Sequence, residues 1–291
     1  MTGSAATDPR FAFGANWQRF LKVLTPERIG EAENSLRGML GLTSLAGQRF
    51  LDIGSGSGLF SLAARRLGAR VVSFDFDPDS VACTAELKRR FFVDDPEWTI
   101  LRGSVLDATF MAQLGMFDVV YSWGVLHHTG EMWRAMQMAA ARVAPGGRLF
   151  IAIYNDQGTQ TRFWTTVKRT YNRLPRALRL PYLVAFAGAL ETAAASLAIV
   201  RLAPAALVRR WTNYESVRGM SRWHDLVDWI GGYPFEVARP EQVFEFYQAR
   251  GFRLAALRTC GGRMGCNEFV FALDAPEGPR PPAVIRQADQ G

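Results

Sequence analysis

Cysteine and histidine are scarce in this chain. Its 291 residues include three of each, and the cysteines are Cys83, Cys260 and Cys266. The cysteines are too few and too unevenly spaced for a disulfide framework or a zinc site, so we expect no metal and a reducing, cytoplasmic setting. Residues 1–10 are polar and small, and they lack the apolar core of a secretory signal peptide.

The excess of positive charge is confined to one part of the chain. A formal net charge of +7 would by itself suit a nucleic-acid partner. Residues 160–222, however, contain eleven Arg or Lys residues and only two acids, Glu191 and Glu215. This local excess is larger than that of the whole chain, so the remaining residues are slightly acidic. Nucleic acid is therefore not the partner that we expect.

The hydrophobic pattern between residues 47 and 154 predicts alternating strands and helices. Strands bounded by glycine, proline or aspartate alternate with segments of helical periodicity, which indicates βαβ units around a parallel sheet. The predicted strands are 49–53, 71–76, 99–101, 117–123 and 148–154, and the predicted helices are 59–67, 78–92 and 131–143. Residues 145–147 are expected to form a turn before the fifth strand.

The alternation stops after Tyr154. Helix-like apolar stretches follow, interrupted by Pro175, Pro181 and Pro204. A helix at 241–250 and strands at 252–258 and 268–273 come next, and the short connection between these two strands requires them to be antiparallel. We expect an N-terminal helical flap, a core, a helical basic insertion or cap, a return to the core and a disordered tail, at residues 1–46, 47–154, 155–235, 236–274 and 275–291.

A glycine-rich turn follows the first predicted strand. Gly54, Gly56 and Gly58 alternate with other residues there. Because glycine has no Cβ, the backbone can turn sharply and approach a ligand, and the next helix offers N–H groups to an anionic or carboxylate group. Leu59 stands where a dinucleotide-binding fingerprint has its third glycine. Alone, the turn indicates either nucleotide binding or only a tight connection.

Asp75 strengthens the first of these two interpretations. It ends the second predicted strand about twenty residues after the turn, where a carboxylate can accept hydrogen bonds from both ribose hydroxyls. The alternative is a solvent-facing acid that caps a helix, a role that we assign instead to Asp77. Phe76 either lies against an adenine or packs in the core.

Four segments in this order resemble the motifs of class I S-adenosylmethionine methyltransferases. The antiparallel terminal strands separate that fold from the dinucleotide-binding dehydrogenases. The resemblance covers roughly residues 47–153 and the last two strands. It implies an α/β fold with a seven-stranded Rossmann-like sheet, an antiparallel last strand, a helical insertion after the fifth strand, and S-adenosyl-L-methionine as cofactor. The segments are 50–58, 74–78, 117–122 and 145–149.

The resemblance also implies which residues bind the cofactor. Asp75 would bind the ribose, the loop 103–106 would border the adenine, and Asp52 would lie near the methionine portion. Relatives usually have an acid after the glycine of that loop, whereas this chain has Ser104. The expected cofactor-binding residues are Asp52, Gly54, Ser55, Gly56, Gly58, Asp75, Phe76, Ser104, Val105, Ser122 and Trp123.

Two of the three histidines, His127 and His128, follow the fourth predicted strand. They lie at the carboxyl edge of the sheet, where ligands of open α/β folds bind. A similar pair occurs in the ubiquinone-biosynthesis O-methyltransferases, and the resemblance favours His128 over His127 as a general base. Such a base contributes roughly 10²–10⁴-fold. Alternatively, one imidazole packs or caps a helix, the other shapes the pocket, and proximity alone supplies ~7–11 kcal/mol.

The basic segment 160–222 has three interpretations. It could be a lid that also touches anionic lipid at the membrane periphery, a cap for specificity or homodimerisation, or an RNA groove, for which Trp164, Tyr171 and Trp211 are the only support. Residues 180–200 approach membrane-spanning length, but Glu191 at their centre makes a poor span.

These patterns together predict an S-adenosylmethionine-dependent methyltransferase. We expect a small-molecule or lipid-linked acceptor that is methylated at oxygen. The alternatives are N-, C- or sugar methylation, methylation of RNA, or a non-catalytic protein that binds the cofactor.

Overall fold

The computed structural model describes residues 17, 20–21, 24–200, 229–262 and 265–275. Most of the expected tail, the first part of the expected flap and residues 201–222 of the basic segment therefore lie outside the described residues.

Seven strands form a single sheet with the order β3-β2-β1-β4-β5-β7-β6. Strands β1 to β5 are parallel, and β7 runs antiparallel to both β5 and β6. This confirms the predicted sheet with its antiparallel last strand. The strands are β1 Arg49–Ile53, β2 Arg70–Asp75, β3 Trp98–Arg102, β4 Phe117–Trp123, β5 Val143–Tyr154, β6 Phe252–Arg258 and β7 Cys266–Leu273.

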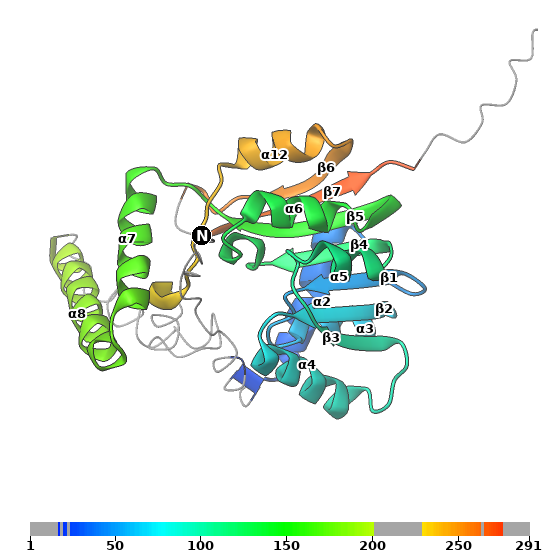
Figure 1. The fold of residues 1–291 in the computed structure, drawn as a ribbon, viewed down its shortest axis with the longest axis horizontal. Coiled ribbons are helices and arrows are strands. Elements are labelled where there is room, and N and C mark those ends of the chain that lie inside the picture. Colours follow the sequence, from blue (N-terminus) through cyan, green and yellow to red (C-terminus); the bar gives the residue numbers. More distant parts are fainter. Residues whose placement is uncertain (1–16, 18–19, 22–23, 201–228, 263–264, 276–291) are drawn as a thin grey trace, which may run out of the picture.

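Helices cover both faces of the sheet (Figure 1). One face packs its buried side chains, such as Phe50 and Phe150, against α2, α3 and α4. The other face packs residues such as Leu51 and Ile53 against α5, α6 and α12. Strands buried on both faces have continuous apolar sequences, as the central strands do here. The helices are α2 Pro26–Leu40, α3 Leu59–Arg66, α4 Pro78–Phe91, α5 Ala108–Gln113, α6 Met132–Ala140 and α12 Pro240–Gln248.

The strand order reverses at β1, which lies between β2 and β4. The chain first builds the sheet on one side of β1 and then crosses to the other side. The crevice at the carboxyl end of such a reversal is the usual ligand site of open α/β sheets. The glycine-rich turn follows β1 and the histidine pair follows β4, so the topology brings them to the same edge.

Two helices that follow β5 stand to one side of the sheet (Figure 1). They are α7 Thr159–Arg173 and α8 Arg176–Val200. Together with the segment 229–235 they enclose a small apolar core of their own, which contains Trp164, Val167, Tyr171, Leu183 and Ile230. No helix in the described part of the chain combines the length and the apolar character needed to cross a bilayer.

Three local features differ from the sequence prediction. Pro175 separates α7 from α8 as expected, but Pro181 does not interrupt a helix, because it lies inside α8. The predicted turn at residues 145–147 is an irregularity within β5, where the register with β4 shifts between Phe117 and Val119. Helix α5 was not predicted, because its six residues are too few to show a helical period.

Gly58, at the start of α3, lies where α3 packs closely against α4. It has a φ of +81°, and an ideal Cβ there would lie 2.8 Å from the Cα of Thr84, a backbone atom that cannot move aside. Gly251 has the same φ, but no atom lies within 4 Å of its ideal Cβ. We expect Gly251→Ala to cost about 1–2 kcal/mol of backbone strain. We expect Gly58→Ala to cost about 1–3 kcal/mol more, from overpacking.

Urea denaturation of the two variants, measured without ligand, gives the difference in their stability. Because both variants have the same backbone strain, this difference is the cost of overpacking at Gly58. Equal transition midpoints would show that the two helices are not held this closely.

Candidate active site

The glycine-rich turn, which follows β1, contacts both neighbours of β1 in the sheet, namely β2 and the segment after β4. The N–H groups of Gly54 and Ser55 both donate to the carbonyl of Phe74, at 2.8 and 3.1 Å. Gly54 has a φ of +75°, and an ideal Cβ there would lie 2.4 Å from the side chain of Val125, just after β4. Only glycine therefore allows the turn and the segment after β4 to approach each other this closely.

Asp75 ends β2 with its carboxylate at the glycine-rich turn. One oxygen accepts a hydrogen bond from the N–H of Gly56 and the other from the N–H of Asp77, both at 2.9 Å. Burial raises the pKa of Asp75, and these two backbone donors oppose the rise. Asp77 caps α4 by accepting from the N–H of Asp79, as predicted. Phe76 is 57% exposed, which excludes the alternative that it packs in the core.

The indole of Trp17 lies beside the same turn. An ideal Cβ at Gly56 would lie 3.1 Å from the Trp17 ring, so the glycine leaves just enough room for the indole. Trp17 meets Phe20 edge to face, with 6.1 Å between the ring centroids. The N-terminal segment thus contacts the turn through an aromatic side chain.

Asp52 is buried beneath α3. Its carboxylate accepts a 2.5 Å hydrogen bond from the hydroxyl of Ser61, which lies 2.7 Å from the hydroxyl of Ser73. Trp98 donates its indole N–H to Ser73 at 2.9 Å. Burial raises the pKa of Asp52 to about 7 and the nearby charge of Asp75 adds to the rise, whereas the Ser61 hydrogen bond opposes it. In the structure Asp52 thus ends a buried chain of hydrogen bonds that links β1, α3, β2 and β3.

Ser55, Ser122 and Trp123 also make internal hydrogen bonds. The hydroxyl of Ser55 lies 2.8 Å from that of Thr84, and the hydroxyl of Ser122 donates to the carbonyl of Ile53 at 3.1 Å. Trp123 is 44% exposed and donates its indole N–H to Glu268 at 3.1 Å. These contacts join neighbouring elements at the carboxyl edge of the sheet.

The loop 103–106 lies beside Asp75. The N–H of Gly103 donates to the Asp75 carbonyl at 3.0 Å, and the hydroxyl of Ser104 accepts from the N–H of Leu106 at 3.2 Å. The side chain of Val105 is buried. The predicted ribose and adenine regions are therefore adjacent in the structure.

His128 lies in the short 3-10 helix η2 (Leu126–His128) after β4, and a backbone carbonyl orients its ring. Its Nδ1 lies 2.6 Å from the carbonyl oxygen of Pro234. A carbonyl can only accept, so the proton of the neutral imidazole is on Nδ1, and Nε2 is the basic nitrogen. Burial lowers the pKa of His128 to about 4, although the Pro234 hydrogen bond favours the charged form. His128 is therefore neutral at pH 7.

His127 is completely buried. Its Nδ1 accepts from the N–H of Tyr154 at 3.3 Å, and the two ring centroids lie 3.9 Å apart. Burial lowers the pKa of His127 well below its usual value, and the neighbouring His128 and Lys168 lower it further. Its Nε2 has no hydrogen-bond partner among the described residues. This environment is that of a packed, neutral side chain.

The segment 229–238 is bonded to both the histidine loop and the end of β5. The N–H of Glu236 donates to the carbonyl of His127 at 3.0 Å, and its carboxylate accepts from the N–H of Met132 at 3.0 Å, at the first turn of α6. The N–H of Ala238 donates to the carbonyl of Tyr154 at 3.0 Å. These bonds join residues about a hundred positions apart, so no local sequence pattern could have predicted them.

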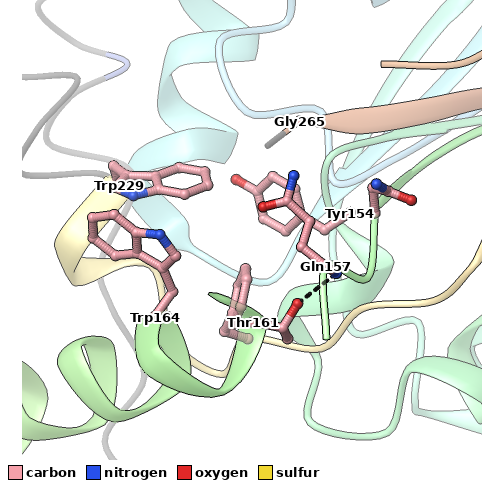
Figure 2. A pocket seen from close by; sticks show the side chains of 8 residues that line it. Tyr154, Gln157, Thr161, Trp164, Trp229 and Gly265 are labelled. Atoms are coloured by element: carbon pink, nitrogen blue, oxygen red, sulfur yellow. Dashed lines mark hydrogen bonds between the residues drawn. The ribbon is translucent and has the colours of Figure 1, made fainter. Parts of the chain in front are cut away.

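A small pocket opens at the carboxyl end of β5, between α7 and the segment 229–235. Figure 2 shows the indoles of Trp164 and Trp229 on one side and the side chains of Tyr154 and Gln157 on the other. The Tyr154 ring also contacts both imidazoles, with centroid distances of 3.9 Å to His127 and 5.5 Å to His128. The pocket is therefore next to the histidine pair. Its lining residues are Tyr154, Asn155, Gln157, Thr161, Trp164, Trp229, Phe235 and Gly265.

Lys168 is a buried cation next to this pocket that the sequence prediction did not single out. Its ammonium donates to the carbonyl of Trp229 and lies 4.5 and 4.7 Å from the ring centroids of Trp229 and Phe235. A signal was present in the sequence. Lys168 shares the i, i+3, i+4, i+7 spacing of a buried helix face with Trp164, Val167 and Tyr171.

The comparison with protein families identifies the fold and the general activity. A methyltransferase domain model matches residues 18–197, which is more than half of the chain. The chain belongs to this methyltransferase family. The predicted family and the predicted enzymatic class are thereby confirmed.

The curated relatives of this methyltransferase include O-methyltransferases. A ubiquinone biosynthesis O-methyltransferase of Xanthomonas euvesicatoria pv. vesicatoria (strain 85-10) is 30% identical over 138 residues, which are 47% of this chain and 53% of that protein. The enzyme of the same name from Xanthomonas campestris pv. campestris (strain B100) is 31% identical over 112 residues, 38% of this chain and 45% of that protein. The chain thus spans about half the length of these relatives.

Two solved structures share the fold. The magnesium protoporphyrin IX methyltransferase from Synechocystis PCC 6803 with bound SAH has a TM-score of 0.50 at 14% identity and covers 89% of this chain and 93% of its own. An O-methyltransferase family protein from Burkholderia thailandensis has a TM-score of 0.51 at 13% identity and covers 94% of this chain and 66% of its own. At these identities the likeness concerns the fold alone.

Proposed function

We propose that this methyltransferase transfers a methyl group from S-adenosylmethionine to a hydroxyl oxygen of a small or lipid-linked acceptor, with His128 as the general base. The observation that carries the proposal is the orientation of His128. Its Nδ1–H is bound to the Pro234 carbonyl, so Nε2 is the basic nitrogen, and the ring lies 5.5 Å from that of Tyr154, which lines an aromatic pocket. The names of the curated relatives, which are O-methyltransferases, support oxygen as the acceptor atom.

The other half of the proposed site is assigned to the methyl donor. The Asp75 carboxylate stands at the end of β2 beside the backbone of Gly56, where a ribose can bind. We assign the ribose to Asp75 and the adenine to Phe76 and the loop 103–106. The donor supplies a methyl group on a sulfonium, which attracts an electron-rich oxygen.

The proposed acceptor half holds a proton acceptor next to an aromatic surface. Aromatic rings of Tyr154, Trp229 and Phe235 form an apolar wall against which the acceptor can be held. Holding two reactants in line contributes ~7–11 kcal/mol by itself. The hydroxyl proton goes to Nε2 of His128, while Nδ1–H stays bound to the Pro234 carbonyl in both charge states. His127 supports this arrangement through packing.

Replacing Asp75 tests the donor site. We expect Asp75→Ala to lower the affinity for S-adenosylmethionine about tenfold or more, because each hydrogen bond to a charged group contributes roughly 1.5–3 kcal/mol. The control is Asp77→Ala, which removes the cap of α4 and costs about 1 kcal/mol of stability without a ribose contact. Calorimetry measures the affinity of each protein for S-adenosylmethionine and for NAD. Binding of NAD alone would contradict the proposed donor.

Replacing His128 tests the base. Asn keeps a side-chain N–H for the Pro234 carbonyl but has no basic nitrogen, so we expect His128→Asn to lower kcat roughly 10²–10⁴-fold. The wild type should keep its activity down to about pH 4, because the pKa of His128 is about 4 and the base is neutral above it. Transfer of radiolabelled methyl to hydroxyl compounds measures both. Full activity of His128→Asn would leave proximity as the mechanism.

We also propose that α7 and α8 touch anionic lipid. Four large apolar side chains on these helices are more than half exposed, and exposed arginines lie near them. Phe163 of this set is next to Trp164 in the pocket wall, so a lipid-linked acceptor would be close to its binding site. The apolar side chains are Phe163, Leu178, Leu180 and Val184, and the arginines are Arg162, Arg169, Arg173 and Arg176.

Liposome flotation tests this contact. We expect the protein to float with vesicles that contain phosphatidylglycerol at low salt and to be released at high salt, because salt screens the arginines. Leu180→Ser combined with Val184→Ser should weaken flotation, since it removes two exposed apolar contacts. If the protein does not float with anionic vesicles at low salt, the proposed lipid contact of α7 and α8 is wrong.

A further inference from the structure

The three glycines of the glycine-rich turn meet three different neighbours. Gly54 packs against the segment after β4, and Gly58 packs against α4. At Gly56 the nearest atoms are Cε2 and Nε1 of the Trp17 indole, both 3.1 Å from an ideal Cβ. The outer two glycines therefore serve contacts between elements of the core, whereas the N-terminal segment covers the middle one.

The methyl donor assigned to this turn needs the surface that the indole covers. In glycine-rich turns of nucleotide-binding α/β folds, the second glycine is the point at which the backbone approaches the ligand. In this turn the second glycine is Gly56, and its N–H donates at 2.9 Å to the Asp75 carboxylate, to which we assign the ribose. A ribose hydroxyl that donates to this carboxylate lies within about 6 Å of the Gly56 nitrogen.

The space between the indole and the turn is too narrow for a ligand. A Cβ lies about 1.5 Å from its Cα, so the Trp17 ring lies at most about 4.6 Å from the Cα of Gly56. An atom placed between the two needs about 7 Å, which is twice the usual contact distance of about 3.5 Å. A donor that lies against Gly56 therefore requires the indole to move.

Trp17 stands at one end of a segment whose other end is fixed. Leu21 is buried in the cluster that also contains residues of α2, α3 and α4, and its carbonyl accepts from the Arg90 side chain of α4 at 3.2 Å. Phe20 is buried as well and meets the indole edge to face. Trp17 itself is only partly buried. The indole can therefore leave Gly56 while Leu21 holds the segment on the core.

We propose that Trp17 covers the donor site of the ligand-free protein and that S-adenosylmethionine displaces its indole from Gly56 on binding. The inference rests on the proposed function in one respect, because it takes the turn and Asp75 as the place of the donor. It goes further by naming a residue of the chain that competes with the donor. The apparent affinity for the donor is then the intrinsic affinity multiplied by the fraction of molecules in which the indole has moved away.

Calorimetry with S-adenosylhomocysteine, the donor without its methyl group, tests the competition on the full chain. Trp17→Ala removes the indole, so we expect it to raise the affinity about fivefold or more, because the open fraction then approaches one. The control is Trp133→Ala, which removes a partly exposed indole from α6 on the other face of the sheet and should change the affinity less than about twofold. An unchanged affinity of Trp17→Ala would overturn the proposal. A lower affinity would overturn it too, because the indole would then pack on the bound donor.

Fluorine NMR of the protein labelled with 5-fluorotryptophan follows the indole itself. The chain has eight tryptophans, and the signal that is missing from Trp17→Phe belongs to Trp17. We expect S-adenosylhomocysteine to increase the difference in this signal's position between H2O and D2O, because the displaced ring contacts more water. A difference that stays the same or falls contradicts the displacement. The measurement uses the wild type, so it decides the question even where Trp17→Ala does not fold.

Asp75→Ala, measured with the same ligand, separates the two ways in which the proposal can fail. If this variant binds S-adenosylhomocysteine as tightly as the wild type, the donor lies elsewhere, and both the proposed donor site and the competition are wrong. If Asp75→Ala binds weakly but Trp17→Ala binds like the wild type, the donor site stands and only the competition is refuted.

Discussion

The close approach of the glycine-rich turn to the segment after β4 is the constraint on which the rest of the site depends. A side chain at Gly54 would collide with Val125, so the absence of a Cβ lets the two segments meet at the point where the strand order reverses. The turn carries the proposed donor half of the site, and the residues directly after Val125 carry the imidazoles. The spacing between the turn and the histidine pair is thus set by packing between segments that follow neighbouring parallel strands.

The acceptor half depends on a segment that returns from the helical region to the core. Residues 229–238 are hydrogen-bonded to the histidine loop, to the first turn of α6 and to the end of β5. Each of these bonds satisfies a polar backbone group that would otherwise be buried at a cost. The same segment contributes Trp229 and Phe235 to the pocket and a carbonyl to Lys168. One stretch of chain therefore orients His128, contributes to the aromatic wall and accepts a hydrogen bond from Lys168.

Burial shifts the ionisable groups of this edge toward their neutral forms. The pKa of Asp52 rises to about 7, and that of His128 falls to about 4. The two shifts have opposite effects on stability as pH changes. The raised pKa of Asp52 makes the fold less stable as pH rises from about 4 toward 7, whereas the lowered pKa of His128 makes it more stable as pH rises from about 4 to 6.5. Burial thus favours the neutral forms of both Asp52 and His128.

The sequence by itself determined the sheet, its antiparallel last strand, the glycine-rich turn and the cap at Asp77. These features depend on contacts between near neighbours, on the alternation of strands and helices, and on short connections, all of which leave a periodic or positional pattern. The tertiary structure alone decided that Phe76 is at the surface, that Pro181 is inside α8, and that Lys168 and Pro234 meet the aromatic pocket and His128. Those outcomes depend on burial and on contacts between residues 61 or 106 positions apart, which no local pattern encodes. The glycine-rich turn, Asp75 and the histidine pair of the proposed site were therefore visible in the sequence, whereas the contacts that residues 229–238 make with that pair were not.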